Sequence, residues 1–181
     1  MEYLDIVDDQ GNPTGKIIER KIAHQKGVQH RTSHVWLLRK KDQLEILVQK
    51  RSDNKDSYPG CYDISSAGHI PAGVDYKASA VRELQEELGI YVNEDQLIEI
   101  GMIHTESKNI FHGSLFHNKQ VSKVFLLWYD QDEFNYQKEE LAGTKWMNFE
   151  ECYAMVKNNS ESNCIHIEEL DFIVEYLKKP E

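Results

Sequence analysis

The sequence predicts one domain of the α/β or α+β class, in which strands are enclosed by two or three helices. Three observations lead to this fold class. The 181 residues suit one compact domain. No repeat or long Gly/Pro/Ser linker divides the chain. Short segments typical of strands lie between two segments of helical periodicity. We therefore expect a single domain over residues 1–181.

The N-terminal half is expected to consist mainly of strands. An opening hairpin is predicted because residues 3–7 alternate weakly and residues 16–20 return after a segment rich in turn formers. A polar stretch containing histidines follows. A turn-rich loop is expected at residues 53–61, and further strands are expected at residues 34–39, 44–49 and 62–67.

The clearest helix is predicted between Asp75, a suitable N-cap residue, and Gly89, which stands where a glycine commonly ends a helix. Apolar side chains at helical spacing form its expected core stripe: Ala78, Val81, Leu84 and Leu88. The rest of the chain should add strands at residues 97–104, 121–129 and 145–149, a polar loop between the first two strands, and an amphipathic helix over residues 165–178.

Composition and charge restrict the classes of function. The net charge is −10, from 21 basic and 31 acidic residues, which argues against a nucleic-acid-binding surface. A local cation can still bind one small diphosphate on an acidic protein. The three cysteines form no CxxC pair, no apolar run approaches a membrane span, and the start has no apolar signal segment. We therefore expect a cytoplasmic protein with neither nucleic-acid nor membrane partners, and a homo-oligomer is compatible with the sequence.

Residues 68–90 carry the pattern that is most informative about chemistry. On a helix, Glu83 and Glu87 would lie about 40° apart, with Glu86 about 60° to the other side of Glu83. One interpretation is a solvated acidic face, on which Arg82 pairs with Glu86 one turn later. The other is a site for Mg²⁺, which prefers carboxylate oxygens, waters and substrate phosphates. Helical geometry alone leaves both interpretations open.

The same segment resembles the Nudix box, which reads Gly, five residues, Glu, seven residues, then REUxEExGU with U aliphatic. The matching positions are Gly68, Arg82, Glu83, Leu84, Glu86, Glu87, Gly89 and Ile90. One position departs, because Val74 stands where the pattern has its first glutamate, so a peripheral metal or water ligand is absent. The resemblance implies an α/β/α sandwich with a mixed central sheet, here extended by an N-terminal hairpin.

The resemblance also implies a metal-dependent hydrolase of a diphosphate linked to another moiety. The implied ligands of Mg²⁺ or Mn²⁺ are Glu83, Glu86 and Glu87 with the Gly68 carbonyl, and Arg82 orients the carboxylates. Glu140, on a later loop, is the expected extra ligand or general base. The implied catalytic residues are thus Arg82, Glu86, Glu87 and Glu140, and the sequence does not decide which glutamate is the base.

A narrower resemblance is to the isopentenyl-diphosphate isomerase-like branch of that family. Its marks are Ala23-His24, His30 before Trp36, Arg51 and Lys55 before Pro59-Gly60, Gly68-His69, and Glu140 before Trp146. The branch implies that Arg51 and Lys55 bind the diphosphate, and that a second divalent transition metal is held by His24, His30, His69 and Glu140. Hydrogen-bonded or exposed histidines are the alternative for this set. The remaining histidines, His34 among them, are expected to be structural or exposed.

The isomerase itself needs a cysteine just before the Gly-His pair, and here that position is Ala67. Alanine neither donates nor accepts a proton. The expected function is therefore hydrolysis of a small-molecule diphosphate, most simply a nucleoside diphosphate or a derivative of one. The alternatives are isopentenyl-diphosphate isomerisation, or a catalytically weak Nudix-fold binding or sensor module, which the valine at position 74 favours.

Overall fold

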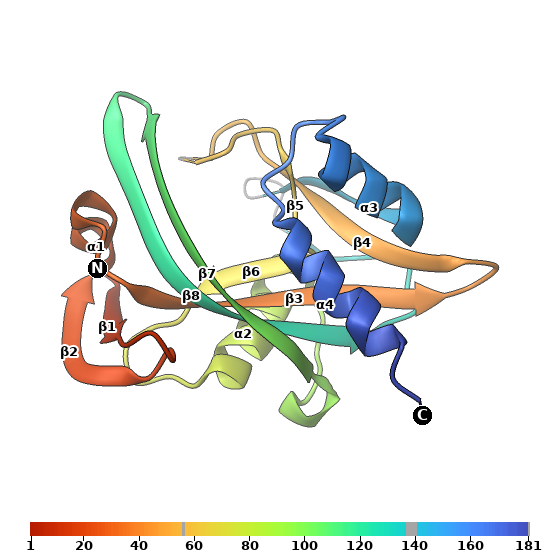
Figure 1. Cartoon of the computed structure of the whole chain (residues 1–181), viewed down its shortest axis with the longest axis horizontal. Helices are drawn as coiled ribbons and strands as arrows, with labels where there is room; N and C mark the ends of the chain where they lie inside the picture. The colour runs from red at the N-terminus through yellow and green to blue at the C-terminus, as the bar shows by residue number, and fades with distance from the viewer. Residues whose placement is uncertain (56, 137–140, 181) are drawn as a thin grey trace.

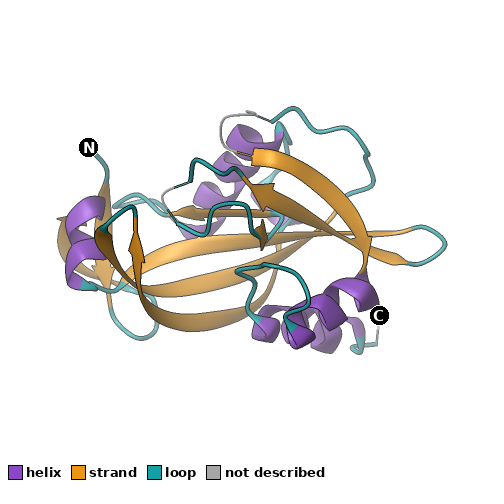
Figure 2. Cartoon of the chain, turned by 90° about the horizontal axis from the view of Figure 1, so that it is seen from above, coloured by secondary structure: helices purple, strands orange, loops and turns teal. Residues whose placement is uncertain are grey.

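A computed structural model describes residues 1–55, 57–136 and 141–180 of the chain. Within these residues, seven strands form a mixed sheet, and a separate two-stranded hairpin precedes it (Figure 1). Helices lie on both faces of the sheet (Figure 2). The predicted α+β fold with a mixed central sheet and an N-terminal hairpin is therefore confirmed.

The hairpin consists of β1 (Tyr3–Val7) and β2 (Pro13–Glu19), which pair antiparallel. It leads directly into α1 (Arg20–Lys26), where the sequence indicated a polar stretch and no helix was predicted. This helix has seven residues, and only Ala23 and His24 are buried, so it shows too little apolar periodicity to be predicted. Gly27 ends it in the left-handed conformation, with φ of 67°.

The central strand of the sheet is β3 (His30–Lys40). It runs parallel to β8 (Ser114–Trp128) and antiparallel to β4 (Leu44–Arg51) and β6 (Ser66–His69). The outer pairings join β5 (Tyr62–Asp63) and β9 (Leu141–Asn148) to β4, and β7 (Ile98–Phe111) to β8. The single strand expected over residues 62–67 is thus two short strands, which pair with different neighbours.

The prediction of a polar loop between the strands at residues 97–104 and 121–129 was wrong. These strands continue as one long antiparallel hairpin, in which Phe111 pairs with Ser114 beside a tight turn at His112 and Gly113. The hairpin projects beyond the rest of the sheet (Figure 1). Outside the core a strand needs its ladder of backbone hydrogen bonds but no apolar alternation, so its polar sequence resembled a loop.

Three longer helices complete the fold. The predicted helix is α2 (Tyr76–Leu88), which Gly89 ends with φ of 68°. Asp75 occupies the N-cap position, but its side chain makes no capping hydrogen bond within the described part of the chain. The last helix is α4 (Ile167–Leu177), close to the expected range. The sequence did not predict α3 (Phe149–Asn158), which Asn148 caps by accepting a hydrogen bond from the Glu151 backbone N–H. A 3₁₀ turn, η1 (Glu94–Gln96), follows α2.

Apolar side chains pack on both faces of the sheet. Trp36 and Leu38 point toward the face covered by α3 and α4, while the alternate residues Val35 and Leu37 point toward α2. On α2 the fully buried apolar residues are Ala80, Leu84 and Leu88, whereas Ala78 and Val81 are only half-buried. The core stripe of this helix was therefore predicted correctly at its C-terminal end only.

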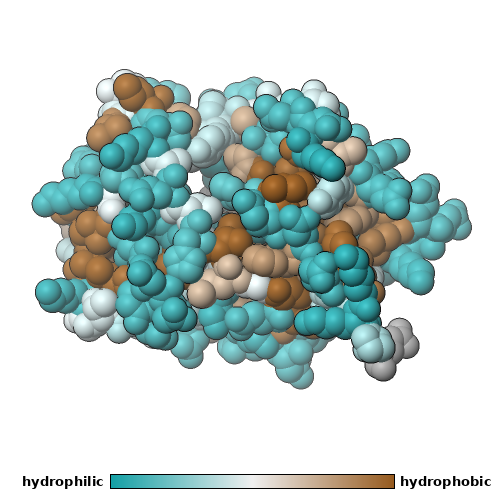
Figure 3. Space-filling view, in the orientation of Figure 1, coloured by the Kyte–Doolittle hydropathy of each residue, from teal (hydrophilic) through white to brown (hydrophobic). Residues whose placement is uncertain are grey.

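The view in Figure 3 shows a mainly hydrophilic face with small apolar areas between the elements. Among the described residues, no helix has both the length and the apolar character needed to cross a membrane.

Candidate functional site

An open cavity of about 1250 Å³ brings together most of the residues that the sequence suggested for the site. Helix α2 contributes carboxylates to its wall, β4 and the following loop contribute cations, and α1 and β6 contribute imidazoles. The suggested residues that line the cavity are His24, Arg51, Lys55, Gly68, His69, Arg82, Glu83, Glu86 and Glu87. His30 lies beside this set, and Glu140 lies outside the described residues.

The backbone of β6 lies directly against the carboxylate of Glu83. A Cβ atom built on Gly68 would lie 2.6 Å from both Cγ and Oε1 of Glu83, and closer still to the carboxyl carbon. Only glycine therefore allows this side chain to lie where it does. The structure pairs Arg82 with Glu83, at 3.0 Å between Nη2 and Oε1, where the sequence predicted a pair with Glu86.

Glu87 on α2 lies in an environment that disfavours its negative charge. Burial raises the pKa of Glu87 to about 8, with further contributions from the charges of Glu83 and Asp63. Gln49 opposes this shift by donating a hydrogen bond of 3.2 Å from Nε2 to Glu87 Oε2. The carboxylate oxygens of Glu83, Glu86 and Glu87 line one cavity beside a close glycine backbone, and such a donor set fits a hard divalent cation such as Mg²⁺ or Mn²⁺.

Arg51 lines the cavity, but its guanidinium already has protein partners. Its Nη1 atom donates to Asp63 Oδ2 at 2.9 Å, while Nε and Nη2 donate to the carbonyl and hydroxyl oxygens of Ser57 at 3.0 and 3.2 Å. Asp63 is buried. Arg51 therefore holds the loop that follows β4 in addition to facing the cavity. Lys55 lies on this loop and is half-buried.

Three imidazoles, from α1, β3 and β6, meet at one side of the cavity. The candidate ligand atoms of His24, His30 and His69 all lie within 4.8 Å of one another. Nε2 of His24 lies 3.2 Å from Nε2 of His69, and Nδ1 of His30 donates to the carbonyl oxygen of Val28 at 2.8 Å. The other ring nitrogen of His30 is buried and has no hydrogen-bond partner among the described residues.

These imidazoles are neutral at neutral pH. Burial lowers the pKa of all three, that of His24 to about 4, and the neighbouring charges of His30 and Arg20 lower the pKa of His24 further. A neutral imidazole offers a nitrogen lone pair to a metal. The cluster, with its buried and unsatisfied ring nitrogen, therefore fits a transition ion such as Zn²⁺ or Mn²⁺ better than it fits a set of exposed histidines.

Sequence reasoning missed an aromatic wall of the cavity. Phe116 on β8 stacks on His24, with ring centroids 4.4 Å apart. Phe111 contacts Phe116 and also Tyr58, which comes from the loop after β4. The wall depends on the long hairpin, so the expectation of a polar loop at this point concealed it.

Sequence reasoning also missed a buried pair, in which His34 on β3 lines another part of the cavity and Glu169 on α4 lies behind it in the core. A signal for Glu169 was present, because it stands one turn before Ile173 and hence on the buried face of its helix.

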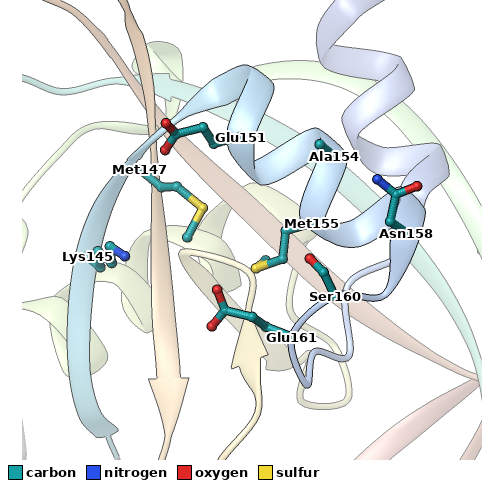
Figure 4. A pocket seen from close by; sticks show the side chains of 8 residues that line it. All are labelled: Lys145, Met147, Glu151, Ala154, Met155, Asn158, Ser160 and Glu161. Atoms are coloured by element: carbon teal, nitrogen blue, oxygen red, sulfur yellow. The ribbon is translucent and has the colours of Figure 1, made fainter.

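A second hollow, of about 320 Å³, lies between β9, α3 and the loop after α3, and includes Met147 and Met155 (Figure 4). It contains none of the suggested site residues.

The fold and the cavity define an α+β domain whose strand–loop–helix segment, residues 66–88, presents several carboxylates to a cavity. A family model described as NUDIX domain matches residues 28–164, so the chain belongs to the Nudix hydrolase family. Members of this family are generally pyrophosphohydrolases and typically use divalent metals.

The relatives agree with this assignment. The chain is 38% identical over 154 residues to Nudix hydrolase 3 of Arabidopsis thaliana, an alignment that covers 83% of this chain but 20% of that protein. It is 30% identical over 160 residues to isopentenyl-diphosphate Delta-isomerase 2 of Photorhabdus laumondii, covering 87% of this chain and 83% of that one. The chain thus spans about a fifth of the Arabidopsis protein.

Among solved structures, the crystal structure of DR0079 from Deinococcus radiodurans shares the fold. The TM-score is 0.66 at 17% sequence identity, and the match covers 98% of this chain and 100% of that one.

Proposed function

We propose that this protein is a Mg²⁺- or Mn²⁺-dependent hydrolase of a diphosphate linked to another moiety, most simply a nucleoside diphosphate or a derivative of one. One observation carries the proposal. The carboxylates of α2 and the cations Arg51 and Lys55 line the same cavity, on elements far apart in the sequence. This arrangement suits a substrate that is itself polyanionic and reacts at phosphorus.

Glu83, Glu86 and Glu87 are the residues that would hold the divalent cation, together with the carbonyl of Gly68. When bound, such a cation neutralises phosphate oxygens and lowers the pKa of a water. Arg82 fixes the position of Glu83 through their ion pair. Glu86 is exposed on the cavity side of α2 and, with Glu87 and Glu140, is a candidate to take the proton from the attacking water.

Lys55 and the guanidinium of Arg51 would contact the distal phosphate. Because Arg51 already donates to Asp63, only the part of its charge that faces the cavity is available to a substrate. The cluster of His24, His30 and His69, completed by Glu140, would hold a second divalent transition metal. The isomerase-like branch supports this assignment, as does the buried Nε2 atom of His30.

The experiment is a turnover panel. The purified protein is incubated with nucleoside diphosphates, nucleotide sugars and isoprenoid diphosphates, with Mg²⁺, Mn²⁺ or EDTA, and the released phosphate and monophosphate products are measured. We expect turnover that EDTA abolishes. Glu86→Gln should lose most of this activity, whereas Glu94→Gln, which removes the same charge from an exposed turn, should retain it. Tight binding without turnover would instead support a sensor module.

A second candidate is isopentenyl-diphosphate isomerisation. The histidine cluster favours it, as does the 30% identity to the Photorhabdus protein of that name. Ala67 argues against it, because no proton-transfer group stands at the position that the isomerase uses. Isoprenoid diphosphates therefore belong in the panel, with their isomers separated after incubation.

A further inference from the structure

The core contains a buried ionisable pair that the proposed hydrolysis does not use. His34 Nδ1 lies 2.7 Å from Glu169 Oε1, and the Trp36 indole N–H donates to the other carboxylate oxygen at 2.9 Å. Glu169 is fully buried and His34 is almost so. Both carboxylate oxygens of Glu169 therefore have a donor, and the imidazole is fixed in one orientation by a residue 135 positions away.

This pair reaches the wall of the cavity. His34 and Thr32 both line it, and they lie on the same face of β3. Strands β3 and β6 pair so that Thr32 is opposite His69 and His34 is opposite Ala67. His34 therefore lies two residues along the strand from the position that faces the histidine cluster. The side chain opposite His34 is a methyl group, which leaves the imidazole as the hydrogen-bonding group of this pair.

The second ring nitrogen of His34 points away from Glu169. Its nearest polar neighbour is Thr32 Oγ1 at 3.3 Å, and that hydroxyl lies 2.6 Å from Ser122 Oγ. This contact joins the imidazole to a short chain of side-chain hydrogen bonds through Thr32 to Ser122. The Nε2 atom of His34 and the hydroxyl of Thr32 are therefore the hydrogen-bonding groups that this part of β3 presents at the cavity wall.

Packing alone gives little reason for such a pair. A buried carboxylate and imidazole carry a large desolvation penalty, and apolar side chains of similar size commonly replace buried ion pairs without loss of stability. The core cluster on this face of the sheet, which includes Trp36, Ile64 and Ile165, is apolar. A hydrogen-bonding use for His34 at the cavity accounts for the pair where packing does not.

We propose that His34, positioned by Glu169, contacts the organic half of the substrate through Nε2, and that it selects a polar organic half, a nucleoside or a sugar, over a hydrocarbon chain. The inference rests on the proposed function, because it places the diphosphate between the carboxylates of α2 and the cations of the loop after β4. Glu169 is a positioning residue in this arrangement. A polar organic half can share hydrogen bonds with His34 and Thr32, whereas a hydrocarbon chain against them gains none, and this difference provides the discrimination.

The test measures binding, so that it does not depend on turnover. Dissociation constants are measured by calorimetry in Mg²⁺ for methylenediphosphonate, for the α,β-methylene analogues of the four common nucleoside diphosphates, and for isopentenyl methylenediphosphonate. The wild type should bind at least one nucleoside analogue about tenfold or more tightly than the other two probes. His34→Gln, which keeps a donor for Glu169 but has no second ring nitrogen, should raise the dissociation constant of that analogue about ten- to a hundredfold. The dissociation constant of methylenediphosphonate should change by no more than about twofold.

Two further variants separate recognition from folding. Asp5→Asn breaks another buried ion pair, in which Arg31 Nη2 lies 2.7 Å from Asp5 Oδ2, and neither residue lines the cavity. It should lower the melting temperature without changing the ratio of the dissociation constants. Glu169→Gln keeps an acceptor for Trp36, and it should reduce nucleoside binding selectively. If His34→Gln does not fold, the dissociation constants of Glu169→Gln test the proposal in its place.

Three results would overturn the proposal. They are wild-type binding of every nucleoside analogue no tighter than methylenediphosphonate, an equal loss for all probes in His34→Gln, and the same selective loss in Asp5→Asn. Failure of the proposed function would look different: the protein would bind the methylene analogues selectively, yet would not hydrolyse the oxygen-bridged nucleotides.

Discussion

Gly68→Ala is the substitution that tests the carboxylate site most directly. Gly68 lies on β6, opposite Ser33 of the central strand, and its backbone does not need a positive φ. The added methyl group would therefore be tolerated by the backbone, but it would meet the side chain of Glu83, whose Cγ and Oε1 atoms lie 2.6 Å from the position of the new carbon. The substitution moves one carboxylate without removing it.

The size of the effect follows from this geometry. Carbon atoms in contact lie about 3.5–4.0 Å apart, so the Glu83 side chain must retreat by about 1 Å. Misplacement by about 1 Å costs on the order of 10²-fold in rate, which corresponds to about 2.7 kcal/mol. The side chain of Glu83 is 16% exposed and has a route toward solvent. The loss of stability should therefore stay below about 1 kcal/mol, or about 2–4 °C in melting temperature.

The assay measures kcat/KM and the Mg²⁺ concentration for half-maximal activity on the best substrate of the panel, alongside thermal unfolding. Gly143→Ala is the matched control, because Gly143 also lies in a strand and a Cβ there would meet no atom of the described residues within 4 Å. It should behave as wild type. If Gly68→Ala keeps wild-type kcat/KM and Mg²⁺ dependence, Glu83 does not act from the position that the structure gives it, and the reasoning is refuted.

Three other predictions concern Glu87, Arg51 and Ala67. Because the pKa of Glu87 is raised, the metal-free folded protein keeps a proton on this residue that the unfolded chain releases near pH 4.5. In EDTA the melting temperature should therefore fall between about pH 5 and pH 8, and it should fall less in Glu87→Gln. Parallel curves for the two proteins would contradict this. Arg51→Ala should lower kcat/KM about tenfold to a hundredfold, and it should destabilise the fold by about 1–3 kcal/mol because Asp63 loses its partner. Arg51→Lys should restore only part of the lost activity. Unchanged stability in Arg51→Ala would show that the ion pair contributes little. The wild type should not interconvert isopentenyl and dimethylallyl diphosphate, because Ala67 has no proton-transfer group; interconversion, followed by chromatography, would direct attention to His34 in the opposite strand.

The parts of the fold that the sequence predicted are those whose apolar pattern is complete within the element. Helix α2 and the strands β3 and β4 each bury a clear set of side chains, so their periodicity is visible. Helix α1 buries only two residues, and the outer part of the β7–β8 hairpin is held by its ladder of hydrogen bonds. Such elements are stabilised by tertiary contacts and by strand pairing, which a local pattern does not express.

The candidate site divides in the same way. The carboxylates of α2 occupy one turn and a half of a single helix, so their common face was readable from spacing. The histidine cluster required a resemblance, because its members come from α1, β3 and β6. The pairs Arg51–Asp63 and His34–Glu169 join residues 12 and 135 positions apart, and each partner alone looks like an ordinary polar residue. Only the fold brings them together.

The charge of the cavity bears on how the proposed hydrolase binds its substrate. The protein carries a net charge of −10, and the positive charge of Arg51 is largely balanced by the buried carboxylate of Asp63. Burial, together with the charges of Glu83 and Asp63, raises the pKa of Glu87 to about 8, so a diphosphate brought beside these carboxylates would meet repulsion. Lys55 contributes one positive charge at the loop after β4, and the other cations that line the cavity, Arg20, Lys21 and Arg82, lie on α1 and α2. We therefore expect the proposed hydrolase to need a divalent cation at the carboxylates of α2 for substrate binding as well as for the attack on phosphorus, because the cation would offset the repulsion between these carboxylates and the phosphates.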